Sequence, residues 1–272
     1  MNTRVFVTGI GIVSPLGLDA ASTWSNLVQG ISGVDYISAF DPEKFETQIA
    51  AEVKGFDPTE YLEKKKTRRL DRFAQFALVA AQEALWQADL KIEKVDPTRV
   101  AAIVGSGIGG IITLSEQYKV LEDRGPNRVS PFLLPMMLAD MGPGQISMMF
   151  GTKGPNFTTV SSCSSGADAI GEASEMIRRG DVDIAIAGGT EAPICPIAIA
   201  GFNACQALSR RNTDPKAASR PFEAHRDGFV IGEGSAILVL ESETSIIRRN
   251  TPALAELMGY GSSSDAHHIT QP

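Results

Sequence analysis

The chain has 272 residues, of which 43% are apolar, enough for one or two domains with a sizeable core. Its 25 basic and 32 acidic side chains give a net charge of −7, which disfavours non-specific binding to nucleic acid. Three cysteines are too few for a disulfide framework, and the most apolar window, 182–202, contains two acidic residues and two prolines. With no secretion signal in the sequence, we expect a globular protein of the cytoplasm, without nucleic-acid or membrane partners.

Strand-like and helix-like segments alternate along the chain, beginning with a strand at 4–8 and a helix at 20–29 that Asp19 can cap. The following expected segments are a helix at 66–88, a strand at 100–104, a helix near 112–122, a helical region at 130–149, a strand at 156–162, a helix at 165–179, and strands at 183–187, 235–240 and 253–259. This alternation is typical of a layered α/β fold. No flexible linker interrupts it, which indicates one compact unit.

A basic cluster lies at the start of the expected helix 66–88. Six basic residues fall within nine positions and are opposed only by Asp71: Lys64, Lys65, Lys66, Arg68, Arg69 and Arg72. On one continuous helix, positions 65, 68, 69 and 72 would share a face. That face is either an ordinary solvated surface or a docking patch for an acidic partner, and the residues alone leave both interpretations open.

Cofactor and metal motifs are weak or absent. The glycines in Gly105-Ser-Gly-Ile-Gly-Gly110 match a dinucleotide fingerprint, which also requires a second strand that ends in an acidic residue, but residues 117–123 have the pattern of a helix and not of a strand. The cysteines form no Cys-x-x-Cys pair, and the adjacent His267 and His268 would point in different directions. A dinucleotide oxidoreductase is therefore a minor alternative, and we expect no cofactor and no metal.

Cys163 lies between an expected strand and an expected helix, in Thr158-Thr-Val-Ser-Ser-Cys-Ser-Ser-Gly166. At a helix N-terminus, free amide groups and the helix dipole favour a negatively charged sulfur and can hold an oxyanion. Its small neighbours leave room for a substrate. Cys163 is thus either a nucleophile or an inert buried cysteine, whereas Cys195 and Cys205 lack this setting and are expected to be packing residues.

Several segments, taken together, resemble the β-ketoacyl-acyl-carrier-protein synthases, the condensing enzymes of fatty-acid synthesis. They occur in the family's order: Val5–Gly17, Ser130–Pro135, Gly151–Pro155, Val160–Gly166, Asp183–Glu191, Ala207–Asn212 and Ala218–Gly234. The last two, Ala207-Leu-Ser-Arg-Arg-Asn212 and Ala218-Ser-Arg-Pro-Phe through Gly232-Glu-Gly234, are the most specific. The resemblance covers essentially the whole chain, and the most similar group is synthase II.

The resemblance implies a thiolase-like layered α/β sandwich of two similar halves, usually in a homodimer. We expect residues 1–250 to form the N-terminal domain and residues 251–272 to begin a C-terminal half that is largely missing. The implied activity is that of an acyltransferase, which condenses an acyl thioester with malonyl-carrier protein to give a 3-oxoacyl product. Acyl carrier protein is the implied partner, and its acidity favours the docking interpretation of the basic cluster.

By matching motifs, the resemblance assigns eight positions. They are the nucleophile Cys163, the substrate-binding residues Ile108, Phe202, His268 and Thr270, and the carrier-docking residues Lys65, Arg68 and Arg69. The backbone N–H of Cys163 would form part of the oxyanion hole. Covalent catalysis of this kind divides one difficult carbon–carbon bond formation into two steps.

Some positions depart from the family pattern. Ser162 precedes the cysteine where the family commonly has Ala, and Ser164 follows it where the family commonly has Ala or Thr. Gln206 stands where the family often has an arginine, and Glu223 where it usually has an aspartate. His225 is expected to be structural. The family's two catalytic histidines and a lysine lie beyond position 270, so we expect these 272 residues alone to condense nothing. The alternative is a non-catalytic half that binds carrier protein or dimerises.

Overall fold

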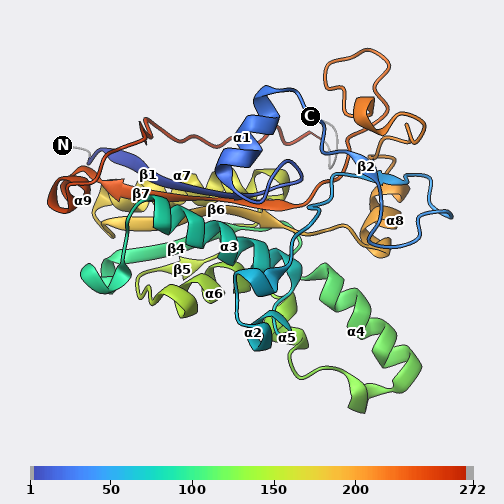
Figure 1. Ribbon diagram of the computed structural model, residues 1–272, viewed down its shortest axis with the longest axis horizontal. Coiled ribbons are helices and arrows are strands. Elements are labelled where there is room, and N and C mark those ends of the chain that lie inside the picture. The colour runs from blue at the N-terminus through green and yellow to red at the C-terminus, as the bar shows by residue number, and fades with distance from the viewer. Residues whose placement is uncertain (1–2, 268–272) are drawn as a thin grey trace.

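A six-stranded mixed sheet forms the centre of the computed structural model, which describes residues 3–267 (Figure 1). The strand order is β5-β4-β6-β7-β1-β8, in which β5, β4 and β6 are parallel and the rest pair antiparallel. The strands are β1 Val5–Val13, β4 Val100–Gly105, β5 Asn156–Phe157, β6 Ile184–Glu191, β7 Gly234–Ser242 and β8 Ala255–Glu256. A separate two-stranded sheet pairs β2 (Asp35–Tyr36) with β3 (Ile49–Ala50).

Helices cover both faces of the six-stranded sheet, and α4 and α5 project from it (Figure 1). The helices are α1 Ala20–Val28, α2 Lys64–Thr67, α3 Arg72–Gln87, α4 Ile111–Arg124, α5 Leu133–Met137, α6 Met141–Phe150, α7 Ser165–Arg179, α8 Pro196–Ala204 and α9 Glu243–Arg249. Helices α3 and α6 pack on one face and α7 on the other. The layered α/β arrangement expected from the alternation of segments is therefore confirmed.

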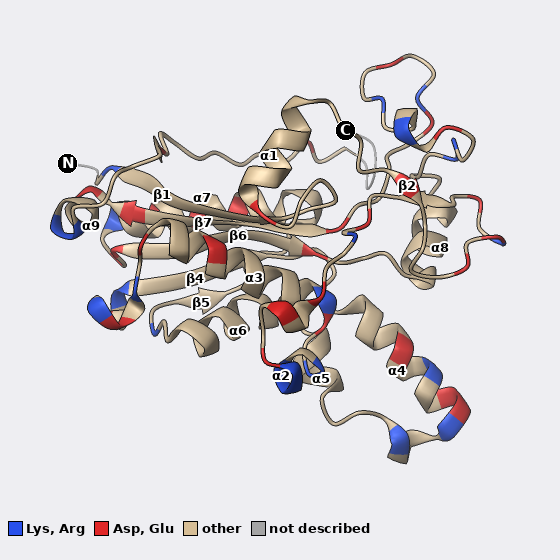
Figure 2. Cartoon of the chain, viewed as in Figure 1, with Lys and Arg blue, Asp and Glu red and all other residues tan. Residues whose placement is uncertain are grey.

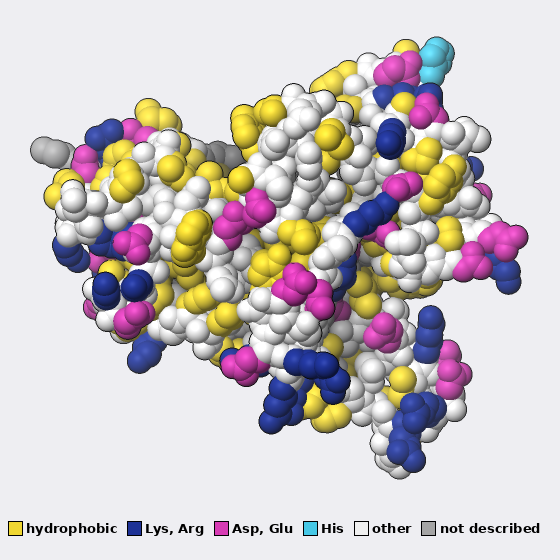
Figure 3. Space-filling view, viewed as in Figure 1, with side chains coloured by type: hydrophobic (Ala, Val, Ile, Leu, Met, Phe, Trp, Pro, Cys, Tyr) yellow, Lys and Arg dark blue, Asp and Glu magenta, His cyan; other side chains and the backbone are white. Residues whose placement is uncertain are grey.

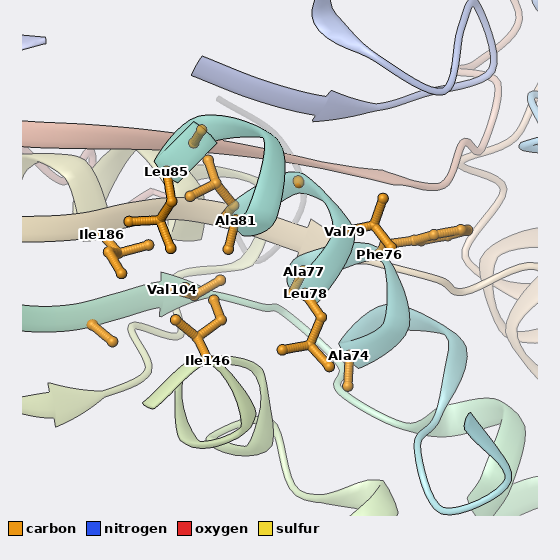
Figure 4. Close-up of a cluster of buried hydrophobic side chains, with 14 of the residues drawn as sticks. Ala74, Phe76, Ala77, Leu78, Val79, Ala81, Leu85, Val104, Ile146 and Ile186 are labelled. Atoms are coloured by element: carbon orange, nitrogen blue, oxygen red, sulfur yellow. The ribbon is translucent and has the colours of Figure 1, made fainter. Parts of the chain in front are cut away.

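Strand β4 shows why the sheet is buried on both faces. All six of its residues are buried. Ala102 and Val104 belong to the apolar cluster that α3 and α6 contribute to, which Figure 4 shows around Ile146, whereas Ile103 packs with Ala173 of α7. Because successive side chains of a strand point to opposite faces, one continuous apolar run can fill two cores.

The expected helix 66–88 is wrong as a single element. The chain forms α2, a turn at 68–70, and then α3, which begins at Arg72. Asp71 causes the break: its buried carboxylate accepts the N–H of Phe73 as the N-cap of α3 and also binds the N–H and hydroxyl of Thr113 at 2.9 and 2.6 Å. As the N-cap, Asp71 has an extended backbone with φ −67° and ψ 159°, so the helical path of α2 cannot continue through it into α3.

Other expected boundaries also moved. The strand at 4–8 extends to Val13, and the helical region 130–149 divides into α5 and α6. The strands expected at 156–162 and 253–259 have only two residues each, in β5 and β8. Strand β8 and the residues around it bind β1, with Leu254 N–H donating to Val7 O at 2.8 Å, and a domain boundary at 250 stays a prediction. Within residues 3–267, no helix is long and apolar enough to cross a membrane.

Candidate active site

Cys163 lies at the carboxyl end of the parallel strands. The segment that contains it follows β5 and forms a short 3-10 turn, Ser162–Ser164, immediately before α7. The N–H of Ser106, just after β4, donates to the carbonyl of Thr159 at 3.3 Å, which holds this segment beside the end of β4. Loops that follow parallel strands gather at this edge, where α/β proteins commonly bind ligands.

The turn presents Cys163 outward in a constrained backbone. The thiol is exposed, so the interpretation of an inert buried cysteine is wrong. Ser162, the residue before it, has φ +55°, a left-handed conformation that costs roughly 1–2 kcal/mol for a residue with a side chain. Ser165, at the start of α7, supports the turn by donating its hydroxyl to Ser162 O at 2.7 Å and accepting Ser161 N–H at 2.9 Å.

Ile108 lies in the loop after β4, beside the turn that carries Cys163. A methyl group placed on Gly107 would lie 3.5 Å from the carbonyl oxygen of Ser162, so the two loops are in contact range. The side chain of Ile108 is 39% exposed. The structure thus brings Ile108 and Cys163 to one end of the sheet.

Glu191, at the end of β6, fixes the loop of Ile108. Its carboxylate accepts Gly107 N–H at 2.6 Å, Ser106 hydroxyl at 3.0 Å and Ile108 N–H at 3.4 Å. Burial raises the pKa of this half-buried carboxyl, while the hydrogen bonds to the loop oppose the shift.

This arrangement disfavours a dinucleotide at Gly105–Gly110. The loop amides that would bind a pyrophosphate already bind the carboxylate of Glu191. Gly110 is required by packing, because a Cβ there would lie 2.2 Å from the carbonyl oxygen of Met136. The glycine pattern is thus explained by the approach of two backbones.

Phe202 lies in a separate apolar cluster. It is half-buried on α8 and packs edge-to-face on Phe229, with ring centroids 5.5 Å apart. Ile194, Ile199 and Leu208 belong to the same cluster. His268 and Thr270 lie outside the described residues, so their assignments stay predictions.

The basic cluster lies around α2 (Figures 2 and 3), and three of its expected members are exposed. Lys65 lies on α2, and Arg68 and Arg69 lie in the turn that follows it. The guanidinium of Arg69 stacks over the ring of Phe132, 4.5 Å from its centroid. This contact orients Arg69 while leaving the residue accessible.

Arg72 does not belong to this surface, which corrects the expected four-residue basic face. Its guanidinium pairs with Glu233, whose side chain is only 3% exposed, at 2.8 Å, and donates to the carbonyl of Val53 at 2.9 Å. It also stacks on Phe76, 4.7 Å from the ring centroid. Arg72 is therefore partly buried, and it lies in the first turn of α3, after the break at Asp71, instead of on a continuation of α2.

The two remaining cysteines differ in burial. Cys195 is buried as expected, and burial raises the pKa of its thiol. Cys205 is exposed at the end of α8, so its assignment as a packing residue is wrong. In residues 3–267, no group of three or more His, Cys, Asp or Glu side chains could hold a metal ion.

Three residues beside the site were not identified from the sequence. Glu191 ends an apolar strand, and this position is the sequence signal that could have identified its half-buried carboxylate. Asp168 binds Ser161 and Tyr260 through its carboxylate. These pairings join positions up to 92 residues apart, so no local pattern indicates them.

The comparisons with known proteins agree with this geometry. Residues 2–245 match the model of the β-ketoacyl synthase N-terminal domain. The chain is 48% identical over 271 residues to 3-oxoacyl-[acyl-carrier-protein] synthase 2 of Staphylococcus aureus (strain COL), covering all of this chain and 65% of that protein. It is 44% identical over 269 residues to the protein of the same name from Synechocystis sp., covering 99% of this chain and 65% of that protein.

Solved structures show the same relationship. A β-ketoacyl synthase from Burkholderia phymatum is 34% identical with TM-score 0.91, covering 100% of this chain and 67% of that one. A ketosynthase solved as AntDE:AntF, a type II polyketide acyl-carrier protein in complex with its ketosynthase, is 31% identical with TM-score 0.85, covering 98% and 65%. The chain spans about 65% of the length of the curated relatives it matches. The expected thiolase-like α/β fold is confirmed, and the chain belongs to the β-ketoacyl synthase family.

Proposed function

We propose that this chain contains the acyl-accepting centre of a 3-oxoacyl-acyl-carrier-protein synthase. The observation that carries the proposal is the exposed thiol of Cys163 in a strained strand-to-helix turn at the N-terminus of α7. An accessible thiol at a helix N-terminus combines a nucleophile with nearby amide groups that stabilise negative charge. The family membership and the names of the relatives support the same chemistry.

The proposed reaction has two steps. First, the sulfur of Cys163 attacks the carbonyl of an acyl-carrier thioester; the carrier leaves as a thiol, which takes up the proton lost by Cys163, and a new thioester remains on the protein. Second, malonyl-carrier protein loses CO₂, and its carbanion attacks that thioester. This step forms the new carbon–carbon bond, breaks the thioester of Cys163 and releases 3-oxoacyl-carrier protein; the sulfur of Cys163 leaves as a thiolate and takes up a proton from water. The N–H of Cys163 is proposed to hold the oxyanion in both steps.

We assign substrate contacts to Ile108, Phe202, His268 and Thr270. Ile108 has the best structural support, because its loop lies against the turn of Cys163 and is fixed by Glu191. Phe202 belongs to a second apolar cluster at the same end of the sheet, the end where α8 lies in Figure 1. The other two are assigned from the family motif alone.

Acyl carrier protein is the proposed partner, docked on Lys65, Arg68 and Arg69. Their exposure next to the active end of the molecule supports this, as does a relative solved with its carrier protein. A homodimer belongs to the same proposal, because the sheet has two edge strands, β5 and β8, each of which pairs with a single described strand and leaves an edge free for pairing. Sedimentation velocity measures that assembly. The cytoplasm is the proposed compartment.

Acyl transfer to Cys163 is the decisive experiment. We expect the mass of the wild-type protein to increase by one acyl group after incubation with acyl-carrier protein, and peptide mapping to place that group on Cys163. The Cys163→Ser variant should gain no thioester. Cys205→Ser is the matched control, because Cys205 is also exposed and would be labelled by accessibility alone. An unmodified wild type, or an acyl group on Cys205, would overturn the proposal.

The same experiment distinguishes the second candidate, a half that binds carrier protein without chemistry. This candidate is tested because the chain spans about 65% of the length of its curated relatives. Carrier binding without acylation of Cys163 would support that alternative. Condensation is tested by adding malonyl-carrier protein to the acylated protein, and our expectation remains that this chain alone gives no 3-oxoacyl product.

A further inference from the structure

Asp168 connects the two sides of the turn that carries Cys163. It lies in the first turn of α7, and its carboxylate accepts a hydrogen bond from the hydroxyl of Ser161, two residues before the cysteine. The same carboxylate accepts the hydroxyl of Tyr260 at 2.8 Å. One side chain therefore joins the segment before the nucleophile, the helix after it, and a residue 92 positions further along.

Tyr260 is held in place by contacts of its own segment. Leu257 donates its N–H to Val5 O at 2.9 Å, and its carbonyl accepts Arg178 Nη2 at 2.6 Å, so the segment is tied both to β1 and to α7. A Cβ on Gly171 would lie 2.2 Å from Cδ2 of Tyr260, which means that the ring rests on the backbone of α7. The position of the Tyr260 hydroxyl is thus set by the tertiary structure.

The turn needs such a restraint because its backbone is strained. Ser162 has φ +55°, and it is flanked by Ser161, which binds Asp168, and by Cys163. The hydrogen bond from Ser161, and to a smaller extent the one from Tyr260, holds the pKa of the Asp168 carboxyl below its usual range. Asp168 therefore remains a charged acceptor at neutral pH, and charged acceptors form the stronger hydrogen bonds.

We propose that Asp168 is a positioning residue for Cys163, which together with Ser161 and Tyr260 fixes the strained turn that presents the thiol. Its effect on chemistry rests on the proposed function of Cys163. The segment 255–260, which is distant in sequence, would thereby control the nucleophile's geometry. Nothing in the arrangement requires Asp168 to touch the substrate.

The first test is hydrogen exchange, which measures the restraint without any activity. Tyr260→Phe removes one donor and leaves the charge unchanged; Asp168→Asn removes the charge and one acceptor. Tyr118→Phe and Asp123→Asn, on exposed positions of α4, are matched controls. We expect amide exchange in peptides covering 158–166 to accelerate about tenfold in the first pair, with β4 and β6 unchanged. Exchange equal to that of the controls would overturn the proposal.

The second test separates positioning from simple stability. At saturating acyl-carrier protein, we expect both variants to acylate Cys163 about tenfold more slowly, with unchanged KM because the docking residues lie elsewhere. The double variant should be no slower than the worse single variant, because both changes break one network. If amide exchange in 158–166 is faster in the variants but Cys163 is acylated at the wild-type rate, Asp168 has only a structural role and the proposal is overturned. If the wild type is never acylated, the proposed function fails instead, and the exchange measurement alone decides the restraint.

Discussion

At the scale of single residues, carboxylates organise the site and its surroundings. Asp71 and Glu233 are buried, and Glu191 is half-buried. Each accepts hydrogen bonds from a segment distant in sequence: Asp71 from Thr113 of α4, Glu233 from Val53 in a loop, and Glu191 from Gly107 beside the turn of Cys163. A carboxylate removed from water needs such partners, since leaving it unpaired costs several kcal/mol. Such residues therefore fix the positions of loops that have no regular structure.

Glu191 provides a test based on pH. Its pKa in the folded protein lies above the ordinary value of 4.5, so its stabilising contribution is complete below about pH 4.5 and is lost as the pH rises through the folded pKa. The Glu191→Gln side chain cannot ionise. We therefore expect the wild type's free energy of unfolding, relative to that of Glu191→Gln, to decrease in urea titrations as the pH rises above about 4.5.

The control is Glu256→Gln, in which the opposite sign is expected. The pKa of Glu256 is lowered, mainly by its hydrogen bond with Arg4, so its contribution is present above the ordinary value and is lost as the pH falls. A pH-independent difference for Glu191→Gln would show that its carboxyl has the same pKa in the folded and unfolded protein.

At the scale of elements, the junction of α2 and α3 decides which basic side chains face solvent. Lys65, Arg68 and Arg69 stay exposed, whereas Arg72, in the first turn of α3, is partly buried and pairs with the buried carboxylate of Glu233. A continuous helix would have placed Arg72 beside Arg68 and Arg69. The break at Asp71 thus separates the proposed docking surface from the ion pair of Arg72 and Glu233.

This separation predicts different effects for neighbouring arginines. Arg72→Ala should lower the free energy of unfolding by about 3 kcal/mol, because it leaves the buried carboxylate of Glu233 without its partner. Arg68→Ala should change it by less than about 0.5 kcal/mol, because Arg68 is exposed. Urea unfolding measures both. Arg72→Ala combined with Glu233→Gln should recover part of the loss, and equal effects of the two single variants would contradict the assignment.

At the scale of the whole molecule, charge is unevenly distributed. The chain carries a net charge of −7, yet Lys and Arg side chains gather around α2 (Figures 2 and 3). A positive patch on a negative protein attracts an acidic partner to one face and repels it elsewhere. This distribution would orient a carrier protein toward the end of the sheet where Cys163 lies.

Charge reversal tests this orientation. We expect Lys65→Glu and Arg68→Glu each to weaken binding of acyl carrier protein about tenfold at low salt, mainly through slower association. Both differences should shrink in high salt, because the charges are exposed and screened. Binding is measured by biolayer interferometry. The matched control is Lys91→Glu, because Lys91 is an exposed lysine in the loop after α3. Equal losses for Lys91→Glu would show that only net charge matters.

Local residue patterns were enough to predict the α/β class, the order of the main elements and the position of Cys163 between a strand and a helix. These features are local: the apolar run of β4, the periodicity of α7 and the small residues around the cysteine are each visible within a few turns of chain. The resemblance of ordered motifs to one family added the proposed chemistry. Patterns within a few turns of chain are sufficient for these predictions, because the burial of one face of a strand or helix imposes them.

Four features arise from the packing of distant segments: the break at Asp71, the pairing of Arg72 with Glu233, the attachment of the Ile108 loop to Glu191 and the link from Asp168 to Tyr260. Each depends on a partner 42 to 161 residues away. A polar side chain has the same local sequence signal whether it faces water or a distant donor. The choice is made by the packing of the layers, which determines which donors and acceptors meet where water is excluded.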